Sequence, residues 1–408
     1  MKVLLVNKFH FLKGGSERVY FETGSLLEKK GHQVIYFSMK DKRNVYSPQE
    51  KYFVENVDFT SRKNWLRKSF RYIYYKKAAE NLERLILAEK PDIAHLHNIS
   101  HHITPAILKT LKKYGIPVVQ TLHDYQIICP NYRLFTEGAV CERCKKRKYY
   151  NCVLHRCIQN GFAPSVLGAK ELYFQWFFKF YREKVDLFIC PSGFLQTKLK
   201  DWGVKQKTKV VPNFIDLENF EPNYTVGDYI VCVSRLSAEK GIMDLLEAVR
   251  ALPEVKLKLV GDGPMRAEVL DYLKKNNVKN VEYAGAKFDE ELKEVIRKSR
   301  FAIIPSEWYE NYPLIALESM ALGKPVLSAK IGGLAGMIAE NFNGWFFESS
   351  DVNDLQSKLS LHYNEIERIE ELGKNARRTV EEKNSAEKYY QEISACYDIV
   401  LKNEMDNG

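Results

Sequence analysis

The hydrophobic residues in the first half of the chain gather in short runs, at Val3–Val6, Gln33–Phe37, Pro91–His97, Val118–Leu122 and Asp186–Cys190. Runs of this length, bounded by turn residues, indicate buried strands. Amphipathic segments, which indicate helices, lie between them at Glu17–Lys30 and Pro105–Lys113. Because strands alternate with helices, we expect βαβ units and a parallel sheet.

The same alternation continues in the second half of the chain. Further runs indicate strands at Tyr229–Val233, Lys256–Val260, Val281–Ala284 and Phe301–Ile304. Helices are predicted at Ile242–Arg250, Leu314–Leu322, Asp354–Tyr363, Ile366–Glu381 and Ala386–Leu401. The polar stretch that ends at Asp228 is typical of a linker. A chain of 408 residues suits two or three such domains.

The stretch from Ile303 to Val326 organises the second half. Its polar loop carries Glu310, and the helix predicted after Pro313 carries Glu318 in its second turn. Free amides at a helix start bind anions, and the helix dipole favours negative charge there. A carboxylate beside an anion site suits a ligand with both phosphates and hydroxyls, such as a sugar nucleotide. The alternative is an ordinary capped helix with two solvated acids.

The order Glu310, seven residues, Glu318 and then Met-Ala-x-Gly-x-Pro-Val resembles the donor-site signature of the retaining glycosyltransferase family 4. The resemblance implies an α/β GT-B fold, in which two doubly wound Rossmann-like domains face a cleft and a C-terminal helix crosses back to the first domain. It also implies donor binding by Glu310, Asn311, Tyr312, Leu314 and Glu318.

The resemblance covers nearly the whole chain and divides it. Residues 1–210 correspond to an acceptor-binding domain with a Cys-rich insertion at 129–157, residues 211–385 to a nucleotide-sugar-binding domain, and residues 386–408 to the returning helix. The connection Pro212-Asn213-Phe214-Ile215-Asp216 resembles the family's Pro-Asn-Gly-Val-Asp, with Phe214 in the place of the usual glycine.

Two cations follow the first strand of the second domain. Arg235 lies at its carboxyl end, and Lys240 lies on a turn before the next helix. An arginine fork and a lysine point charge suit a leaving diphosphate, whereas the alternative is two surface cations. The block resembles the family's diphosphate-binding Arg and Lys. Because no Asp-x-Asp occurs in the chain, we expect no catalytic metal, and the cations with helix-start amides balance the leaving-group charge.

The first domain offers two candidate site segments. Gly14-Gly15 either allows a ligand to approach a helix start or makes a plain tight turn, and the resemblance favours contact with donor phosphate or acceptor. His123 follows the strand Val118–Leu122, and ligands of open α/β sheets bind beyond the carboxyl ends of strands. The resemblance implies that His123 contacts the donor sugar. His95, His97, His101 and His102 are interpreted as local polar and surface positions.

The cysteines form an unusual segment. Cys141-x-x-Cys144 is half of a tetrahedral zinc knuckle, and the other two ligands come from Cys129, Cys152, Cys157 or His155. A subset of family 4 is similar here and commonly has an apolar residue at the place of Cys152. That likeness selects Cys129, Cys141, Cys144 and Cys157 for a structural zinc; the alternative is reduced thiols that pack a loop.

Charge and apolar run length bear on location. The net charge is +10 and the pI about 8.9. Arg62–Lys77 holds seven Lys/Arg and no Asp/Glu among aromatic residues. It suits an anionic membrane surface, or equally a solvated face above a core-facing aromatic stripe. Without a signal peptide or a run near the ~20 apolar residues of a spanning helix, we expect a cytoplasmic protein, peripheral on the inner membrane surface.

These patterns and the resemblance predict a hexosyltransferase of polysaccharide biosynthesis. It takes a UDP- or GDP-linked sugar and transfers it, with retention, to a glycan or lipid-linked acceptor. One rival is a sugar-nucleotide epimerase of the same fold, which releases a rearranged donor. The other is a zinc-knuckle nucleic-acid binder, which leaves both helix-start blocks unexplained. We therefore expect no nucleic-acid partner.

Overall fold

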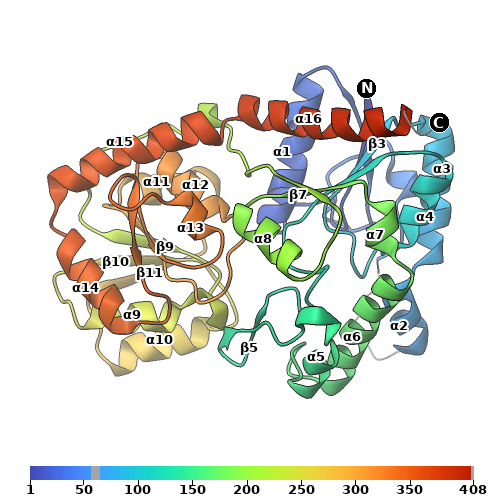
Figure 1. Cartoon of the computed structure of the whole chain (residues 1–408). Helices are drawn as coiled ribbons and strands as arrows, with labels where there is room; N and C mark the ends of the chain where they lie inside the picture. Colours follow the sequence, from blue (N-terminus) through green and yellow to red (C-terminus); the bar gives the residue numbers. More distant parts are fainter. Residues whose placement is uncertain (57–64, 406–408) are drawn as a thin grey trace. The chain divides into compact units, whose positions relative to one another are not determined.

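The computed structural model describes residues 1–56 and 65–405, with the side chains of residues 65–67 and 403–405 left out. The chain divides into two units. Unit 1 comprises Met1–Leu134, Cys141–Val211 and Tyr389–Gly408, and unit 2 comprises Phe135–Val140 and Pro212–Lys388. Each unit contains a six-stranded parallel sheet with helices packed against it (Figure 1), so the predicted α/β fold class with two Rossmann-like domains is confirmed.

The sheet of unit 1 has the order β2-β1-β3-β4-β7-β8. Its strands are β1 Lys2–Val6, β2 Gln33–Phe37, β3 Ile93–Leu96, β4 Val118–Thr121, β7 Leu187–Cys190 and β8 Lys207–Val210. The central strands are buried on both faces, which explains why they appear in the sequence as continuous apolar runs. Only β8 escaped prediction, because this edge strand reads Lys-Thr-Lys-Val.

Helices connect these strands and make up the rest of unit 1. They are α1 Gly15–Lys29, α2 Trp65–Ile73, α3 Lys76–Glu89, α4 Ala106–Lys113, α5 Tyr150–Leu154, α6 Phe162–Phe177, α7 Phe180–Lys184 and α8 Gly193–Asp201, with short 3₁₀ turns at Glu50–Tyr52 and Lys145–Arg147. Phe135–Thr136 and Ala139–Val140 form a two-stranded hairpin, β5–β6, which belongs to unit 2 although it lies between segments of unit 1 in the sequence. The hydroxyl of Ser192 caps α8 by accepting from the Leu195 N–H at 3.1 Å.

The sheet of unit 2 has the order β11-β10-β9-β12-β13-β14. Its strands are β9 Ile230–Val233, β10 Leu257–Val260, β11 Val281–Gly285, β12 Ala302–Ile304, β13 Val326–Ala329 and β14 Gly344–Phe347. Its helices are α9 Ile242–Arg250, α10 Arg266–Lys275, α11 Asp289–Arg297, α12 Leu314–Ala321, α13 Leu334–Met337, α14 Val352–His362 and α15 Ile366–Lys383, with 3₁₀ turns at Leu217–Asn219 and Ala238–Lys240. The chain therefore runs outward from β9 to β11 and then continues with β12 on the other side of β9.

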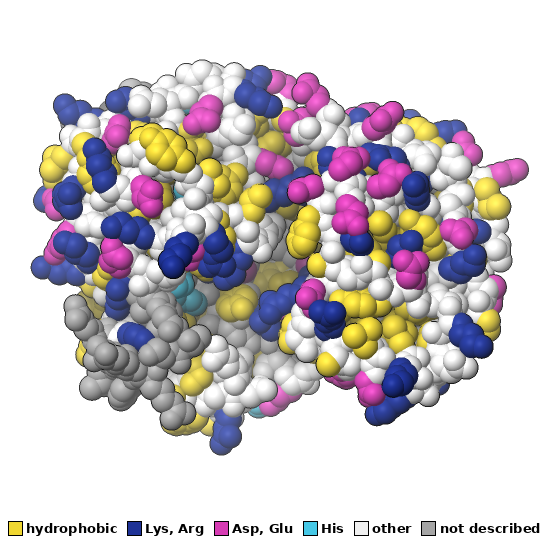
Figure 2. Space-filling model, turned by 180° about the vertical axis from the view of Figure 1, so that it is seen from behind, with side chains coloured by type: hydrophobic (Ala, Val, Ile, Leu, Met, Phe, Trp, Pro, Cys, Tyr) yellow, Lys and Arg dark blue, Asp and Glu magenta, His cyan; other side chains and the backbone are white. Residues whose placement is uncertain are grey.

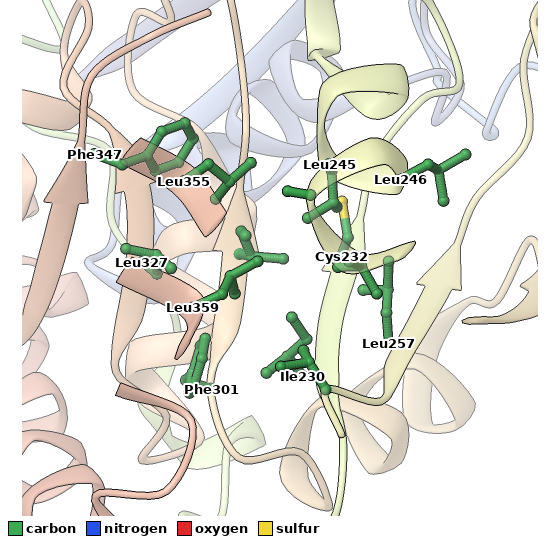
Figure 3. Packing of buried hydrophobic residues seen from close by; sticks show 14 of the residues in the cluster. Ile230, Cys232, Leu245, Leu246, Leu257, Phe301, Leu327, Phe347, Leu355 and Leu359 are labelled. Atoms are coloured by element: carbon green, nitrogen blue, oxygen red, sulfur yellow. The ribbon is translucent and has the colours of Figure 1, made fainter. Parts of the chain in front are cut away.

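Two hydrophobic clusters form the core of unit 2: one lies between its sheet and the helices α9 and α14, and the other includes residues of α11, α12 and α15. Figure 3 shows Leu245 and Leu246 of α9 and Leu355 and Leu359 of α14 near strand residues such as Cys232 and Leu327. Burial of each such side chain contributes about 1.5–3 kcal/mol of hydrophobic free energy. The surface is mixed: Figure 2 shows cationic and acidic side chains interspersed over the visible face.

The interpretation of the polar stretch before Asp228 as a linker was wrong. This segment is part of unit 2, where Phe214, Ile215 and Phe220 are buried. The Ile215 N–H donates to the Asn384 carbonyl at 3.0 Å. Single apolar residues in a polar stretch have no periodicity, so the sequence pattern did not indicate their burial.

The last helix, α16 Ala386–Met405, returns to unit 1 from Tyr389 onward, as predicted. The Tyr389 hydroxyl lies 3.0 Å from Thr23 Oγ1, and the Tyr397 hydroxyl lies 2.8 Å from His95 Nδ1. Within the described residues, no helix combines the length and the apolar character needed to cross a membrane.

Candidate functional site

The strand order places the topological switch point of unit 2 between β9 and β12, from which the chain proceeds in opposite directions. Open α/β sheets bind ligands at such a point, beyond the carboxyl ends of the strands. Arg235 and Lys240 follow β9, and Glu310 follows β12. The fold therefore brings the three predicted residues to this end of two neighbouring strands.

Lys240 and Glu310 form an ion pair although they are 70 positions apart: Lys240 Nζ lies 2.5 Å from Glu310 Oε1. The Ser306 hydroxyl donates to the same oxygen at 2.6 Å. Burial alone would raise the pKa of Glu310, but the charge and hydrogen bond of Lys240, with the bond from Ser306, hold it below its ordinary value. Glu310 is therefore a fixed, ionised acceptor of hydrogen bonds.

Two glycines allow the loops around this pair to approach each other. Gly241 has φ +63°, and a Cβ there would lie 1.9 Å from the Pro305 carbonyl oxygen. A Cβ on Gly333 would lie 1.7 Å from the Asn311 oxygen, and the Gly333 N–H donates to the Glu310 carbonyl at 2.6 Å. Gly333 and Ser306 were not singled out from the sequence. The signal available was the Gly332-Gly333 pair in the loop that follows β13.

Arg235 and Glu318 differ in exposure. Arg235 is exposed, and within the described residues no hydrogen bond or ion pair engages its guanidinium. Glu318 is buried in α12, and Leu314 is the first residue of that helix. Arg235 is therefore a cation available to a ligand.

The loop before α12 is tied into unit 2. Asn311 is buried. The Tyr312 carbonyl accepts from Asn213 at 3.1 Å, and its hydroxyl accepts from Asn384 at 2.8 Å. The two asparagines are themselves joined, since Asn384 Nδ2 donates to the Asn213 carbonyl at 2.8 Å. These bonds hold the loop of the predicted donor-binding residues against the start of unit 2.

Unit 1 has its switch point between β1 and β3. Gly14 and Gly15 lie there, at the start of α1, and both are exposed. A Cβ on Gly14 would meet only Glu17, at 3.7 Å, so packing within the chain does not require a glycine there. The Lys8 N–H donates to the Asn98 carbonyl at 2.7 Å and joins the loops that follow the two strands.

His123, predicted as a site residue, lies against His97: His123 Nε2 is 2.8 Å from His97 Nδ1. Burial, with the charge of Lys8, lowers the pKa of His123 to about 4, and burial lowers that of His97 well below its usual value. Both rings are therefore neutral near pH 7. His97 Nε2 is buried and has no hydrogen-bond partner in the part of the chain that the structure describes. Because an unpaired lone pair costs less than an unpaired N–H, we assign the proton to His97 Nδ1, which leaves the proton of His123 on Nδ1.

The interpretation of His95 and His97 as surface positions was wrong, since both are buried. His95 lies 2.7 Å from the Thr121 hydroxyl and stacks on His97 at 4.7 Å between ring centres. Polar side chains on a buried strand are satisfied by neighbouring strands and helices, which a local pattern does not show. Lys8, whose charge reaches His123, was also missed.

Similarity to known proteins agrees with this geometry. A family model described as Glycosyltransferase Family 4 matches residues 13–219, and one described as Glycosyl transferases group 1 matches residues 216–379. An uncharacterized glycosyltransferase of Methanocaldococcus jannaschii is 30% identical over 311 residues, which are 76% of this chain and 84% of that protein. The chain belongs to glycosyltransferase family 4.

Two further similarities concern ligands of relatives. The UDP-Gal:alpha-D-GlcNAc-diphosphoundecaprenol alpha-1,3-galactosyltransferase of Escherichia coli is 23% identical to this family 4 chain over 311 residues, which are 69% of each protein. The crystal structure of HepE from Anabaena, in complex with UDP and glucose, superposes with a TM-score of 0.70 at 17% identity and covers 98% of this chain and 99% of that one. At this identity the second similarity shows the fold alone.

The thiols selected for zinc in this family 4 chain lie close enough to affect one another. Burial, with the thiols of Cys157 and Cys141, raises the pKa of Cys129 to about 12. Burial and the same neighbours, with Cys129, raise the pKa of Cys144 to about 12. Cys152, which the prediction left out, is a free thiol that is hydrogen-bonded to the thiol of Cys157. Within the described residues, however, no group of three or more His, Cys, Asp or Glu side chains is arranged so that it could hold a metal ion.

The basic segment Arg62–Lys77 falls partly outside the described residues, which resume at Trp65. In α2, the Tyr72 ring stacks on His101 at 4.1 Å and Phe70 is exposed. Tyr74 packs against Phe174 with 6.0 Å between ring centres. Among the described aromatic side chains of this segment, Tyr72 and Tyr74 therefore pack against other rings, whereas Phe70 is exposed.

A carboxyl group three residues before Glu310 gives a pH-dependent stability. Burial, with the charge of Asp244, raises the pKa of Glu307 from 4.5 to about 7. The folded state therefore binds this proton more tightly than the unfolded state, and the contribution of Glu307 to stability falls as the pH rises through this range. We expect Glu307→Gln to have the Tm of wild type at pH 5 and a Tm a few degrees higher at pH 8. The difference at pH 8 corresponds to about 1 kcal/mol in the free energy of unfolding, because solvent screens the half-buried carboxylate. Melting curves of both proteins between pH 5 and 8 test this, and identical slopes would contradict it.

Proposed function

We propose that this glycosyltransferase transfers a hexose-type sugar from a UDP- or GDP-linked donor to a glycan or lipid-linked acceptor, with retention of configuration and without a catalytic metal. The observation that carries the proposal is the Lys240–Glu310 pair at the switch point of unit 2, where β9 also leads to the exposed Arg235. The complex of HepE with UDP and glucose supports the donor class, and the diphosphoundecaprenol-linked substrate of the Escherichia coli relative supports the acceptor class.

Each residue of the pair has a separate role in this proposal. An ammonium group has three N–H donors, so Lys240 keeps its bond to Glu310 and still donates to a leaving diphosphate. Arg235 adds a bidentate fork to the same group. Glu310 accepts hydrogen bonds from donor sugar hydroxyls, Glu318 binds the ribose, and His123 orients the sugar.

The state of Glu310 supports retention without a covalent intermediate. Its Oε1 already accepts from Lys240 and Ser306, which lowers its nucleophilicity. The leaving phosphate departs from the face that the acceptor attacks and takes the acceptor proton. Arg235 and Lys240 balance the negative charge that develops on the phosphate.

The proposal places the protein in the cytoplasm, at the inner membrane surface. The cations of α2 supply attraction to anionic lipid, at about 1 kcal/mol for each cation near the surface. The first domain then takes its acceptor at the membrane.

A panel of nucleoside diphosphate sugars, followed by thermal shift, tests the donor. A donor present at ~100 times its Kd should stabilise the protein by about 2.7 kcal/mol. NMR of the product from that donor and a lipid-linked or free glycan then reports the anomer. We expect the configuration of the donor sugar to be kept. An inverted product, or release of a rearranged donor without transfer, would exclude the proposed reaction.

A structural zinc held by Cys129, Cys141, Cys144 and Cys157 remains a prediction. Binding requires these thiols to turn towards a common point and to lose protons, since two of them have a pKa of about 12 without metal. We expect about one zinc per chain, and a Tm that falls when a chelator is added. Metal analysis of protein prepared without added zinc is the measurement; a metal-free protein of unchanged Tm would rule the site out.

A further inference from the structure

The C-terminal end of α6 exposes three consecutive aromatic side chains. Trp176, Phe177 and Phe178 keep 45%, 71% and 46% of their surface exposed, whereas Leu172 of the same helix is buried. The Arg147 guanidinium lies 4.5 Å from the Trp176 ring centre. Adjacent exposed aromatic groups mark an interaction site more often than a plain surface. We call these three residues the aromatic end of α6.

A small pocket opens beside this end, and Trp176 forms part of its wall. Its volume is about 160 Å³, below the roughly 300–1,000 Å³ of sites for drug-sized ligands, so it suits a small chemical group. No acidic residue lines it, and its cationic lining residues are Arg147, Lys179, Arg182 and Lys205. The charge of the lining favours an anion.

The pocket also contains groups that the chain itself does not satisfy. Lys179 pairs with Glu183 at 2.9 Å, but no hydrogen bond or ion pair within the described residues engages Arg182 or Lys205. Trp202 lines the pocket and is buried, and its shielded indole N–H has no acceptor among the described residues. An oxyanion in the pocket would pair with both Arg182 and Lys205.

We propose that this pocket binds the phosphate of an anionic phospholipid headgroup, while the aromatic end of α6 enters the membrane interface. Arg182 and Lys205 bind the phosphate oxygens. Phe177 and Phe178 contact the acyl region, as aromatic side chains do at membrane interfaces. The inference rests on the membrane association in the proposed function, and it adds a lipid site separate from α2.

The combination of features favours a lipid over other anions. A free phosphate compound would use the cations but would leave the exposed phenyl rings in water. A nucleic acid needs a basic track along several phosphates, whereas this pocket is single and small. A phospholipid in a bilayer accounts for both the pocket and the aromatic end.

Flotation of the full chain with vesicles tests the site. Vesicles contain phosphatidylcholine alone or mixed with phosphatidylglycerol, at low and high salt. Each cation at an anionic surface strengthens binding about fivefold, so Arg182→Ala with Lys205→Ala should weaken binding to anionic vesicles about 30-fold. The matched control is Lys200→Ala with Lys207→Ala, two exposed cations that flank the same turn but do not line the pocket. Phe177→Ser should also weaken binding, and its control is Phe162→Ser at the other end of α6, 62% exposed.

Three results would overturn the inference. The first is equal binding to anionic vesicles by Arg182→Ala with Lys205→Ala, called the pocket pair, and by its control. Inorganic phosphate can shift the Tm of wild type and not of the pocket pair while no variant binds vesicles, which indicates a soluble ligand. Salt-sensitive RNA binding that is lost with the pocket pair indicates a different macromolecule.

The arms separate this inference from the proposed function. The double variant Lys68→Glu with Arg71→Glu tests α2. If this variant loses membrane binding while Arg182→Ala with Lys205→Ala retains it, the membrane association stands and the lipid site is ruled out. Sugar transfer to a soluble acceptor is measured for every variant and should stay within twofold of wild type. Absence of transfer in wild type would refute the proposed reaction and leave the flotation result valid.

Discussion

Lys240→Ala and Arg235→Ala should each lower turnover of the sugar donor by roughly 100-fold. Each variant removes a cation that stabilises the leaving diphosphate, and the loss of one such hydrogen-bond donor costs about 3 kcal/mol in transition-state stabilisation. Measurement of kcat and KM with the donor found by thermal shift tests both variants. Arg266→Ala, an exposed arginine of α10 in the same unit, is the control and should behave as wild type. Wild-type kinetics in both site variants would remove Arg235 and Lys240 from the donor site.

The two variants should differ in stability, which separates binding from folding. Arg235 has no partner for its guanidinium within the described part of the chain, so Arg235→Ala should keep the Tm of the ligand-free protein and lose only the donor-induced shift. Lys240→Ala leaves Glu310 buried without its cation, which raises the pKa of Glu310. Its ligand-free Tm should therefore be lower near pH 7 and recover as the pH falls and Glu310 takes up a proton.

Gly333→Ala should lower both the Tm and donor turnover, although alanine adds one methyl group. The new Cβ would lie 1.7 Å from the Asn311 carbonyl oxygen, so the backbone must move. That movement breaks the 2.6 Å bond from the Gly333 N–H to the Glu310 carbonyl and displaces the acid. We expect a loss of about 2–4 kcal/mol in unfolding free energy and, since small misplacements at a site have large effects, about 100-fold in turnover.

Gly336→Ala is a matched control three residues later. A Cβ at that position would meet nothing within 4 Å, and the residue lies in α13. Alanine there should be neutral or slightly stabilising, by up to about 1 kcal/mol. Melting curves and donor kinetics for both variants compare the same chemical change in two environments. Equal behaviour of the two would show that the close approach at Gly333 is unimportant.

The sequence by itself determined most of the central strands, several helices and the family. Strands buried on both faces of a parallel sheet are continuous apolar runs, so Gln33–Phe37 could be predicted with its observed bounds. Ile242–Arg250 was equally readable, because helix periodicity and its flanking glycine are local signals. Strand order followed in part, since βαβ units restrict topology. This was enough to predict that Arg235, Lys240 and Glu310 follow strands of one sheet.

The tertiary structure decided which of these groups meet. Lys240 reaches Glu310 because β9 and β12 are neighbours and because Gly241 and Gly333 allow loops to approach within the space of a missing methyl group. The His97–His123 contact and the burial of Phe214 have the same origin. Contacts between residues far apart in sequence depend on backbone positions to within a fraction of an ångström. Local hydrophobic patterns carry no information at that scale, so the elements could be predicted and their pairing could not.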